Sequence, residues 1–192
     1  MPGASPEASP TLHGRRRILV IGPGGAGKST FSRQLGEITG LPVVHLDRYF
    51  WTPGWNARPR NEWNVLVAEL TAEEEWIMDG NYGNSLAKRL ERCDAVVFLD
   101  LSRLTCLWSV VKRRVAGARR ARPDMAEQCP ERLSAEFVRW IWRYPKASRP
   151  SILAALERAA CRASVVTVTS RAEAARLLDA LQRARRSTRS GH

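Results

Sequence analysis

The feature that most constrains this chain is a glycine-rich loop between a strand pattern and a helix pattern. The loop covers residues 22–30, Gly-Pro-Gly-Gly-Ala-Gly-Lys-Ser-Thr, and fits the phosphate-binding pattern G-x-x-x-x-G-K-[ST]. Before it, residues 17–21 contain an apolar run with β-branched side chains, which predicts a buried strand. After it, residues 29–37 predict a helix, with Phe31 and Leu35 four positions apart on one face. Strand, loop and helix in this order are the structural context in which the pattern binds phosphate.

The residue types of the loop have a chemical explanation. Glycines let backbone N–H groups turn toward a polyphosphate, and the helix N-terminus adds the positive end of its dipole. Lys28 is expected to reach the β- and γ-phosphates, and the Ser29 hydroxyl to ligate Mg²⁺. The alternative is a glycine-rich turn without a ligand. We predict a site for ATP and Mg²⁺, formed by Gly22, Pro23, Gly24, Gly25, Ala26, Gly27, Lys28, Ser29 and Thr30.

Length and composition limit the domain organisation and the class of protein that this chain can form. A chain of 192 residues fits one domain with a full hydrophobic core, which we expect over residues 15–183. Residues 1–14 are rich in Pro, Ala and Ser, which predicts a disordered segment and not a signal peptide, and residues 184–192 form a basic tail. No apolar run approaches the roughly 18 residues that span a membrane. The four scattered cysteines lack a C-x-x-C pair and favour a cytoplasmic protein without a zinc or redox motif.

The chain is strongly basic, with 31 Lys and Arg against 19 Asp and Glu and a net charge of +12. Such an excess attracts phosphate, whether in ATP or in nucleic acid. The basic residues gather at 112–114, 119–122 and 183–189, and we interpret the last group as a frayed, solvated helix end. Nucleic acid is a possible but not a favoured partner, because no recognition helix or RNA-binding signature is present.

Strand and helix patterns alternate along the rest of the chain. This alternation predicts a parallel sheet between two helix layers, with ligands at the carboxyl ends of the strands. Asp47, Asp79 and the glycine loop all follow strands, so we expect them to converge. Further strands are predicted at residues 42–46, 75–78, 95–99 and 164–168, and helices at 61–71, 85–92, 103–115, 131–144, 150–161 and 171–183.

Several motifs resemble a known family. The loop, the Asp-Gly at 79–80 and the arginine-rich stretch near residue 120 resemble the small P-loop kinases of the adenylate kinase and shikimate kinase type. Further motifs lie at residues 45–49, 51–55, 79–82, 122–126, 129–132 and 139–142. They resemble the adenylate kinase-related proteins described as DNA topology modulation proteins.

The resemblance runs from about residue 17 to residue 181 and implies a fold. This is an α/β, three-layer αβα P-loop NTPase fold with a five-stranded parallel sheet of order 2-3-1-4-5. It carries an arginine-rich lid at about residues 113–130.

The resemblance also implies roles for three carboxylates. A second Mg²⁺ anchor is needed at a strand end beside the loop, where Asp79 and Asp100 both qualify by pattern. The adenylate kinases place their Asp-Gly after the third strand, which favours Asp79; the alternative is that Asp79 only caps a turn, and we interpret Asp100 as structural. Asp47 follows the second strand, where related kinases place a carboxylate that orients or deprotonates the acceptor hydroxyl. The alternative for Asp47 is a strand-ending turn.

Arg120 and Arg122 fall where the fold places its lid. They are expected to stabilise charge on the transferring phosphoryl group; the alternative is a solvated junction between helix and loop.

Gly83 stands where adenylate kinases carry an arginine for the acceptor monophosphate, so an uncharged or hydroxylic acceptor is favoured over AMP. A cluster of four aromatic residues follows Asp47: Tyr49, Phe50, Trp51 and Trp55. Their rings can either stack on a planar ring of a ligand or pack inside the protein, and both alternatives stay open.

These patterns predict an ATP- and Mg²⁺-dependent kinase acting on a small hydroxyl-bearing or nucleotide acceptor. The alternative is a nucleotide-binding regulator that acts on nucleic acid or DNA topology with slow ATP hydrolysis. Asp47 and the lid arginines favour the first interpretation, and the net charge of +12 favours the second.

Overall fold

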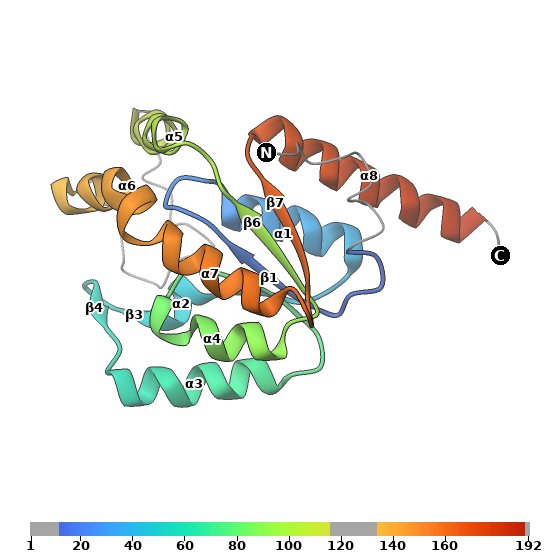
Figure 1. Cartoon of the computed structure of the whole chain (residues 1–192), viewed down its shortest axis with the longest axis horizontal. Helices are drawn as coiled ribbons and strands as arrows, with labels where there is room; N and C mark the ends of the chain where they lie inside the picture. Colours follow the sequence, from blue (N-terminus) through green and yellow to red (C-terminus); the bar gives the residue numbers. More distant parts are fainter. Residues whose placement is uncertain (1–11, 116–133, 191–192) are drawn as a thin grey trace.

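A five-stranded parallel sheet lies at the centre of the molecule (Figure 1). The structure is a computed structural model that describes residues 12–115 and 134–190. The strand order β2-β5-β1-β6-β7 is the predicted order 2-3-1-4-5 when only these strands are counted in chain order, so the predicted topology is confirmed. The strands are β1 Arg17–Ile21, β2 Val43–His45, β5 Trp76–Asp79, β6 Ala95–Leu99 and β7 Ser164–Val168.

Two helix layers cover the sheet, because alternate side chains of each strand point to opposite faces. Ile18 and Val20 of β1 pack with side chains of α1 and α8, while Leu19 and Ile21 pack with side chains of α3, α4 and α7. The three-layer αβα architecture is therefore confirmed. These helices are α1 Lys28–Thr39, α3 Arg60–Ala72, α4 Gly83–Arg92, α7 Arg149–Ala159 and α8 Arg171–Ser190.

The remaining elements gather near the carboxyl ends of the strands. Helices α5 (Arg103–Val115) and α6 (Ala135–Ala147) pack against each other beside the glycine loop (Figure 1). On the other side of that edge, the short helix α2 (Leu46–Phe50) leads into a two-stranded antiparallel hairpin of β3 (Trp51–Thr52) and β4 (Asn56–Ala57).

The strand predicted at residues 42–46 was wrong at its end. Leu46 begins α2, and its side chain is fully buried in the core shared with α3 and α4. An apolar residue that follows a strand pattern does not reveal whether the chain continues straight or turns into a helix, since either course buries it. Asp47 therefore lies in the first turn of a helix and not at a strand tip.

The ends of the described chain also pack against this frame. Leu12 is only 1% exposed and joins the core with α1 and α8, although it lies in the segment expected to precede the domain. Helix α8 continues to Ser190, past residue 183 where we expected it to end. No helix within the described ranges is long and apolar enough to cross a membrane.

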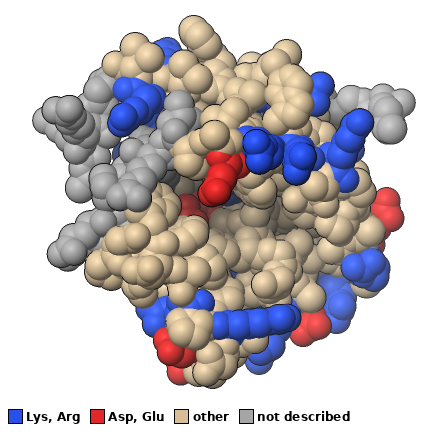
Figure 2. Space-filling view, turned by 90° about the vertical axis from the view of Figure 1, so that its left-hand side faces the viewer, with Lys and Arg blue, Asp and Glu red and all other residues tan. Residues whose placement is uncertain are grey.

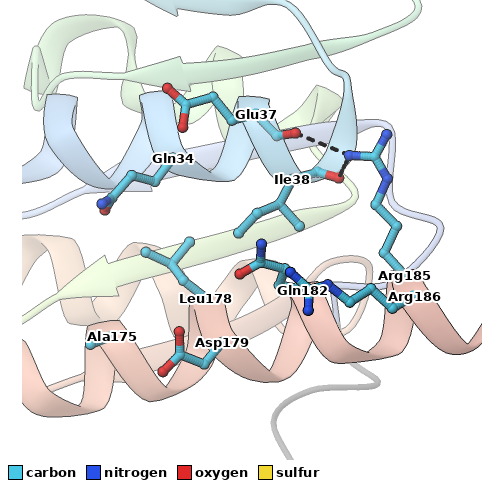
Figure 3. A pocket seen from close by; sticks show the side chains of 9 residues that line it. All are labelled: Gln34, Glu37, Ile38, Ala175, Leu178, Asp179, Gln182, Arg185 and Arg186. Carbon is cyan, nitrogen blue, oxygen red and sulfur yellow. Dashed lines mark hydrogen bonds between the residues drawn. The ribbon is translucent and has the colours of Figure 1, made fainter.

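A cavity of about 420 Å³ lies between α1 and α8 (Figure 3). Arg185 donates hydrogen bonds from there to the backbone carbonyls of Glu37 and Ile38, in the last turn of α1. Helix C-termini leave such carbonyls without partners inside the helix, so Arg185 satisfies them and attaches α8 to α1. This cavity is at the opposite end of α1 from the glycine loop.

The packing of α1 on β2 can be tested at Gly36. A Cβ atom there would lie 2.5 Å from Val43 Cγ2 and 3.3 Å from the Leu41 carbonyl oxygen. We expect Gly36→Ala to lower the free energy of unfolding by about 1–2 kcal/mol, because overpacking outweighs the gain in helix propensity. The measurement is equilibrium unfolding in urea.

Gly83 in α4 provides the matched control, since a Cβ atom there meets nothing within 4 Å. Gly83→Ala should leave stability unchanged or raise it. Equal stabilisation by both substitutions would contradict the close approach of α1 to β2.

Candidate active site

The glycine loop connects β1 to α1 and is packed tightly from both sides. Gly22 and Gly25 have φ angles of 149° and 80°, which side-chain-bearing residues rarely adopt. A Cβ atom at Gly22 would lie 2.5 Å from the Leu99 carbonyl oxygen, and one at Gly25 would lie closer still to the Cys106 carbonyl oxygen. Glycine is therefore required at these positions by backbone conformation and by close packing together.

Two aromatic rings of α6 cover the middle of the loop. Phe137 and Trp140 are stacked, with centroids 5.8 Å apart and an interplanar angle of 16°. A Cβ atom at Gly24 would lie 2.8 Å from Phe137 and 2.7 Å from Trp140. These rings were not predicted to belong to the site from their sequence pattern. They make α6 one wall of the site.

Lys28 lies at the first position of α1 and is folded back over the loop. Its Nζ donates hydrogen bonds to the carbonyl oxygens of Gly22 at 2.9 Å and Pro23 at 3.0 Å. The side chain is half-buried, as is that of the neighbouring Ser29, while Thr30 is exposed. The cation is thus held at the loop by weak neutral acceptors, which a polyphosphate would replace with stronger, charged ones.

Asp79 ends β5 directly beside the loop strand. It pairs in register with Val20 of β1, and it is only 3% exposed. Its Oδ2 lies 2.8 Å from Nδ1 of His45, the residue opposite it on β2. No role was predicted for His45 by itself, although His45 and Asp79 each end a strand of the predicted sheet.

Asp100, the competing carboxylate, is occupied by an arginine. The guanidinium of Arg149 donates to both carboxylate oxygens, at N–O distances of 2.7 to 2.9 Å. This pairing raises the pKa of Arg149 above its ordinary value. Because Asp100 follows β6 and Arg149 begins α7, the ion pair attaches the helix to the sheet edge and supports a structural role for Asp100.

The segment 80–82 after β5 links the glycine loop to Asp47. The Gly22 N–H donates to Oδ1 of Asn81 at 2.9 Å. The Tyr82 hydroxyl donates to Oδ1 of Asp47 at 2.5 Å. Burial and the nearby Asp47 carboxylate raise the pKa of Tyr82 well above its usual value, so the hydroxyl stays a proton donor. Consecutive side chains thus contact the two sides of the site.

The aromatic group after Asp47 divides into core and rim. Phe50 contacts Trp51, Trp63 and Tyr82 at centroid distances of 4.9, 5.1 and 4.6 Å. Trp63 is 2% exposed, so the part of the group around Phe50 serves packing. Trp51 and Trp55 contact each other at 5.3 Å and are half-buried in the hairpin.

Figure 2 shows the side of the molecule that carries α5, α6 and the β3–β4 hairpin. The surface is hollowed near its middle, and both basic and acidic side chains lie at the rim. Arg120 and Arg122 lie outside the described residues, so their role in the lid stays a prediction. Within residues 12–115 and 134–190, no group of three or more His, Cys, Asp or Glu side chains can hold a metal ion by itself.

The structural role of Asp100 can be tested with a double-mutant cycle. We expect Asp100→Asn and Arg149→Met each to lower the free energy of unfolding by about 1–3 kcal/mol, because each leaves a partly buried polar partner behind. The double variant should lose about 1 kcal/mol less than the sum, which is the coupling of a partly exposed ion pair. Urea unfolding measures all four proteins, with the exposed Arg158→Met of α7 as the control. Additive losses would contradict the pairing.

Part of the chain is similar in sequence to shikimate kinases. No known family model matches the chain. Shikimate kinases from Actinobacillus pleuropneumoniae serotype 5b (strain L20) and Actinobacillus succinogenes are 32% and 33% identical over 78 residues, or 41% of this chain. These matches cover 36% and 35% of the relatives, so the matched region is about a third of the curated relatives' length.

A solved structure of shikimate kinase from Acinetobacter baumannii, in complex with shikimate, aligns with 95% of this chain and 98% of its own. Its TM-score is 0.55 at 19% identity. The sheet order, the glycine loop and this likeness together establish that the chain has the fold of a P-loop kinase.

Proposed function

We propose that this protein is a kinase that binds ATP with Mg²⁺ and transfers the γ-phosphoryl group to a hydroxyl of a small acceptor. One observation carries the proposal: the glycine loop, Asp79 and Asp47 lie at one edge of the sheet and are joined through residues 80–82. The fold of a shikimate kinase, a protein solved with the hydroxyl-bearing ligand shikimate, supports it.

The loop suits the nucleotide phosphates. The loop leads into the N-terminus of α1, where backbone N–H groups and the helix dipole favour an anion. Lys28 already lies over the loop, bonded to the carbonyls of Gly22 and Pro23. In the proposed complex Lys28 exchanges these neutral acceptors for the β- and γ-phosphates and balances their charge.

Ser29 and Asp79 suit a magnesium ion. Mg²⁺ prefers oxygen ligands and is held in kinases by one or two protein groups together with the phosphates of the nucleotide. A hydroxyl at the helix start and a buried carboxylate at the neighbouring strand end provide such oxygens. His45 would hold the Asp79 carboxylate in position, as residues behind a metal ligand commonly do. When bound, the ion supplies neutralisation of charge on the transferring phosphoryl group.

Asp47 suits the acceptor hydroxyl. In the proposed step, the acceptor oxygen forms a bond to the γ-phosphorus, the bond from that phosphorus to the ADP oxygen breaks, and the hydroxyl proton passes to the Asp47 carboxylate. Phosphoryl transfer depends mainly on positioning and charge neutralisation, so one well-oriented carboxylate suffices. The Tyr82 hydroxyl holds one of the Asp47 oxygens and so fixes its orientation.

The acceptor class rests on the residue that begins the helix after β5. Gly83 begins α4 where an adenylate kinase would carry its monophosphate-binding arginine, which favours a neutral or hydroxylic acceptor over AMP. Arg120 and Arg122 are proposed to approach the transferring group from the lid. The resemblance to DNA topology modulation proteins rests on sequence motifs alone and stays a prediction.

The nucleotide site is tested at Lys28. We expect Lys28→Ala to weaken ATP binding by roughly tenfold to a hundredfold, because a charge-assisted hydrogen bond to phosphate is lost, and to abolish measurable turnover. Titration with a fluorescent ATP analogue measures the affinity. Lys88→Ala, at an exposed lysine of α4, is the control and should bind normally. Normal turnover in Lys28→Ala would exclude the loop as the nucleotide site.

The acceptor role is tested at Asp47, after a screen of sugars, nucleosides and hydroxy acids for ADP production. We expect Asp47→Asn to slow transfer to the acceptor about a hundredfold or more, the scale of a positioned base. Background hydrolysis of ATP should fall much less, since water does not depend on that carboxylate for its position. Asp179→Asn, at an exposed position of α8, is the control. Equal loss of both activities would show that Asp47 is structural.

A further inference from the structure

Arg89 is the most unusual buried group in the part of the chain that the structure describes. It lies on α4 and is 0% exposed, between Leu86 and Leu90 on the face that packs under the sheet. Among the described residues, no carboxylate forms an ion pair with it. Burial lowers the pKa of Arg89 to about 10, so its guanidinium still carries a charge near pH 7.

Within residues 12–115 and 134–190, the guanidinium donates its hydrogen bonds to backbone carbonyls of one short segment. It donates to the carbonyl oxygens of Gly80 at 2.8 Å, Asn81 at 2.7 Å and Tyr82 at 3.0 Å. A planar group with several N–H donors can reach consecutive carbonyls at once, which an ammonium or amide cannot do as well. Arg89 thus holds the backbone of segment 80–82 through three successive carbonyls.

That segment needs to be held. Tyr82 has a φ angle of 20° and Gly80 one of 127°. Positive φ is unfavourable for a tyrosine and persists only where surrounding contacts determine the backbone. Carbonyls fixed at three successive residues provide such a constraint.

We infer that Arg89 is a positioning residue that sets both sides of the reaction through segment 80–82. Asn81 accepts from the first N–H of the phosphate loop, and Tyr82 donates to the proposed acceptor carboxylate Asp47. The same backbone conformation aims both side chains, so one buried cation couples the nucleotide side to the acceptor side. The part that concerns Asp47 rests on the function proposed above.

The test is a double-mutant cycle on nucleotide affinity, which requires no acceptor. The probe is a fluorescent ATP analogue with Mg²⁺, titrated into the full chain. We expect Arg89→Met and Asn81→Ala each to weaken binding about tenfold, the upper range for one lost hydrogen bond. The double variant should bind no more weakly than the worse single variant, because Asn81 is already misplaced without Arg89. Independent losses that multiply to about a hundredfold would overturn the inference.

Controls separate positioning from general damage to the fold. Arg92→Met removes an exposed arginine from the same helix and should leave affinity within about twofold. Circular dichroism verifies folding, and if Arg89→Met does not fold, Arg89→Lys replaces it in the cycle. Millimolar guanidinium, far below denaturing concentrations, should restore affinity to Arg89→Ala but not to Asn81→Ala. If guanidinium does not restore affinity to Arg89→Ala, and the losses of affinity in the Arg89 and Asn81 variants multiply, Arg89 is a purely structural residue.

The outcomes distinguish this inference from the proposed function. If Lys28→Ala binds ATP as well as the original chain, the nucleotide site itself is wrong. If Lys28→Ala weakens ATP binding as expected while the Arg89 and Asn81 losses multiply, the nucleotide site stands and only the role of Arg89 is overturned.

Discussion

The parallel pairing of β1 with β5 is the constraint on which the rest of the site depends. In this register Val20 lies opposite Asp79, so the residues that come after the two strands leave the sheet side by side. The chain continues from β1 into the glycine loop and from β5 into segment 80–82. The hydrogen bond from the Gly22 N–H to Asn81 joins these two segments immediately after the strands end. A shift of this register would move Asp79 and Asn81 away from the loop together.

The polar groups at this edge would be unfavourable in an otherwise apolar core if they lacked partners. Each of the charged ones has a specific partner: Asp79 contacts His45, Asp100 contacts Arg149, and Arg89 contacts a run of carbonyls. These partners also separate two carboxylates that look alike in sequence. Asp100 is held on both oxygens by an arginine, whereas Asp79 is held by a histidine beside the phosphate loop.

The strands of the sheet were predictable because each contains a short apolar run, and the three central strands β1, β5 and β6 are buried on both faces along nearly their whole length. The order of the strands followed from the resemblance to P-loop kinases. Helix α2 and the β3–β4 hairpin were not predicted, since five residues and two-residue strands are too short for a periodic pattern. The burial of Arg89 was predictable in principle, because it lies between Leu86 and Leu90 on the apolar face of a predicted helix. Its carbonyl partners could not be predicted from the sequence, because these hydrogen bonds depend on how the backbone of residues 80–82 folds against α4.

We propose that the end of β5, and not the end of β6, provides the metal-binding carboxylate. The most direct measurement is ATP affinity as a function of Mg²⁺ concentration in Asp79→Asn and Asp100→Asn, each verified to be folded. We predict that Asp79→Asn raises the Mg²⁺ requirement while metal-free nucleotide binding changes little, and that Asp100→Asn keeps the original Mg²⁺ dependence. The reverse pattern, with Asp100→Asn alone requiring more Mg²⁺, would contradict the claim.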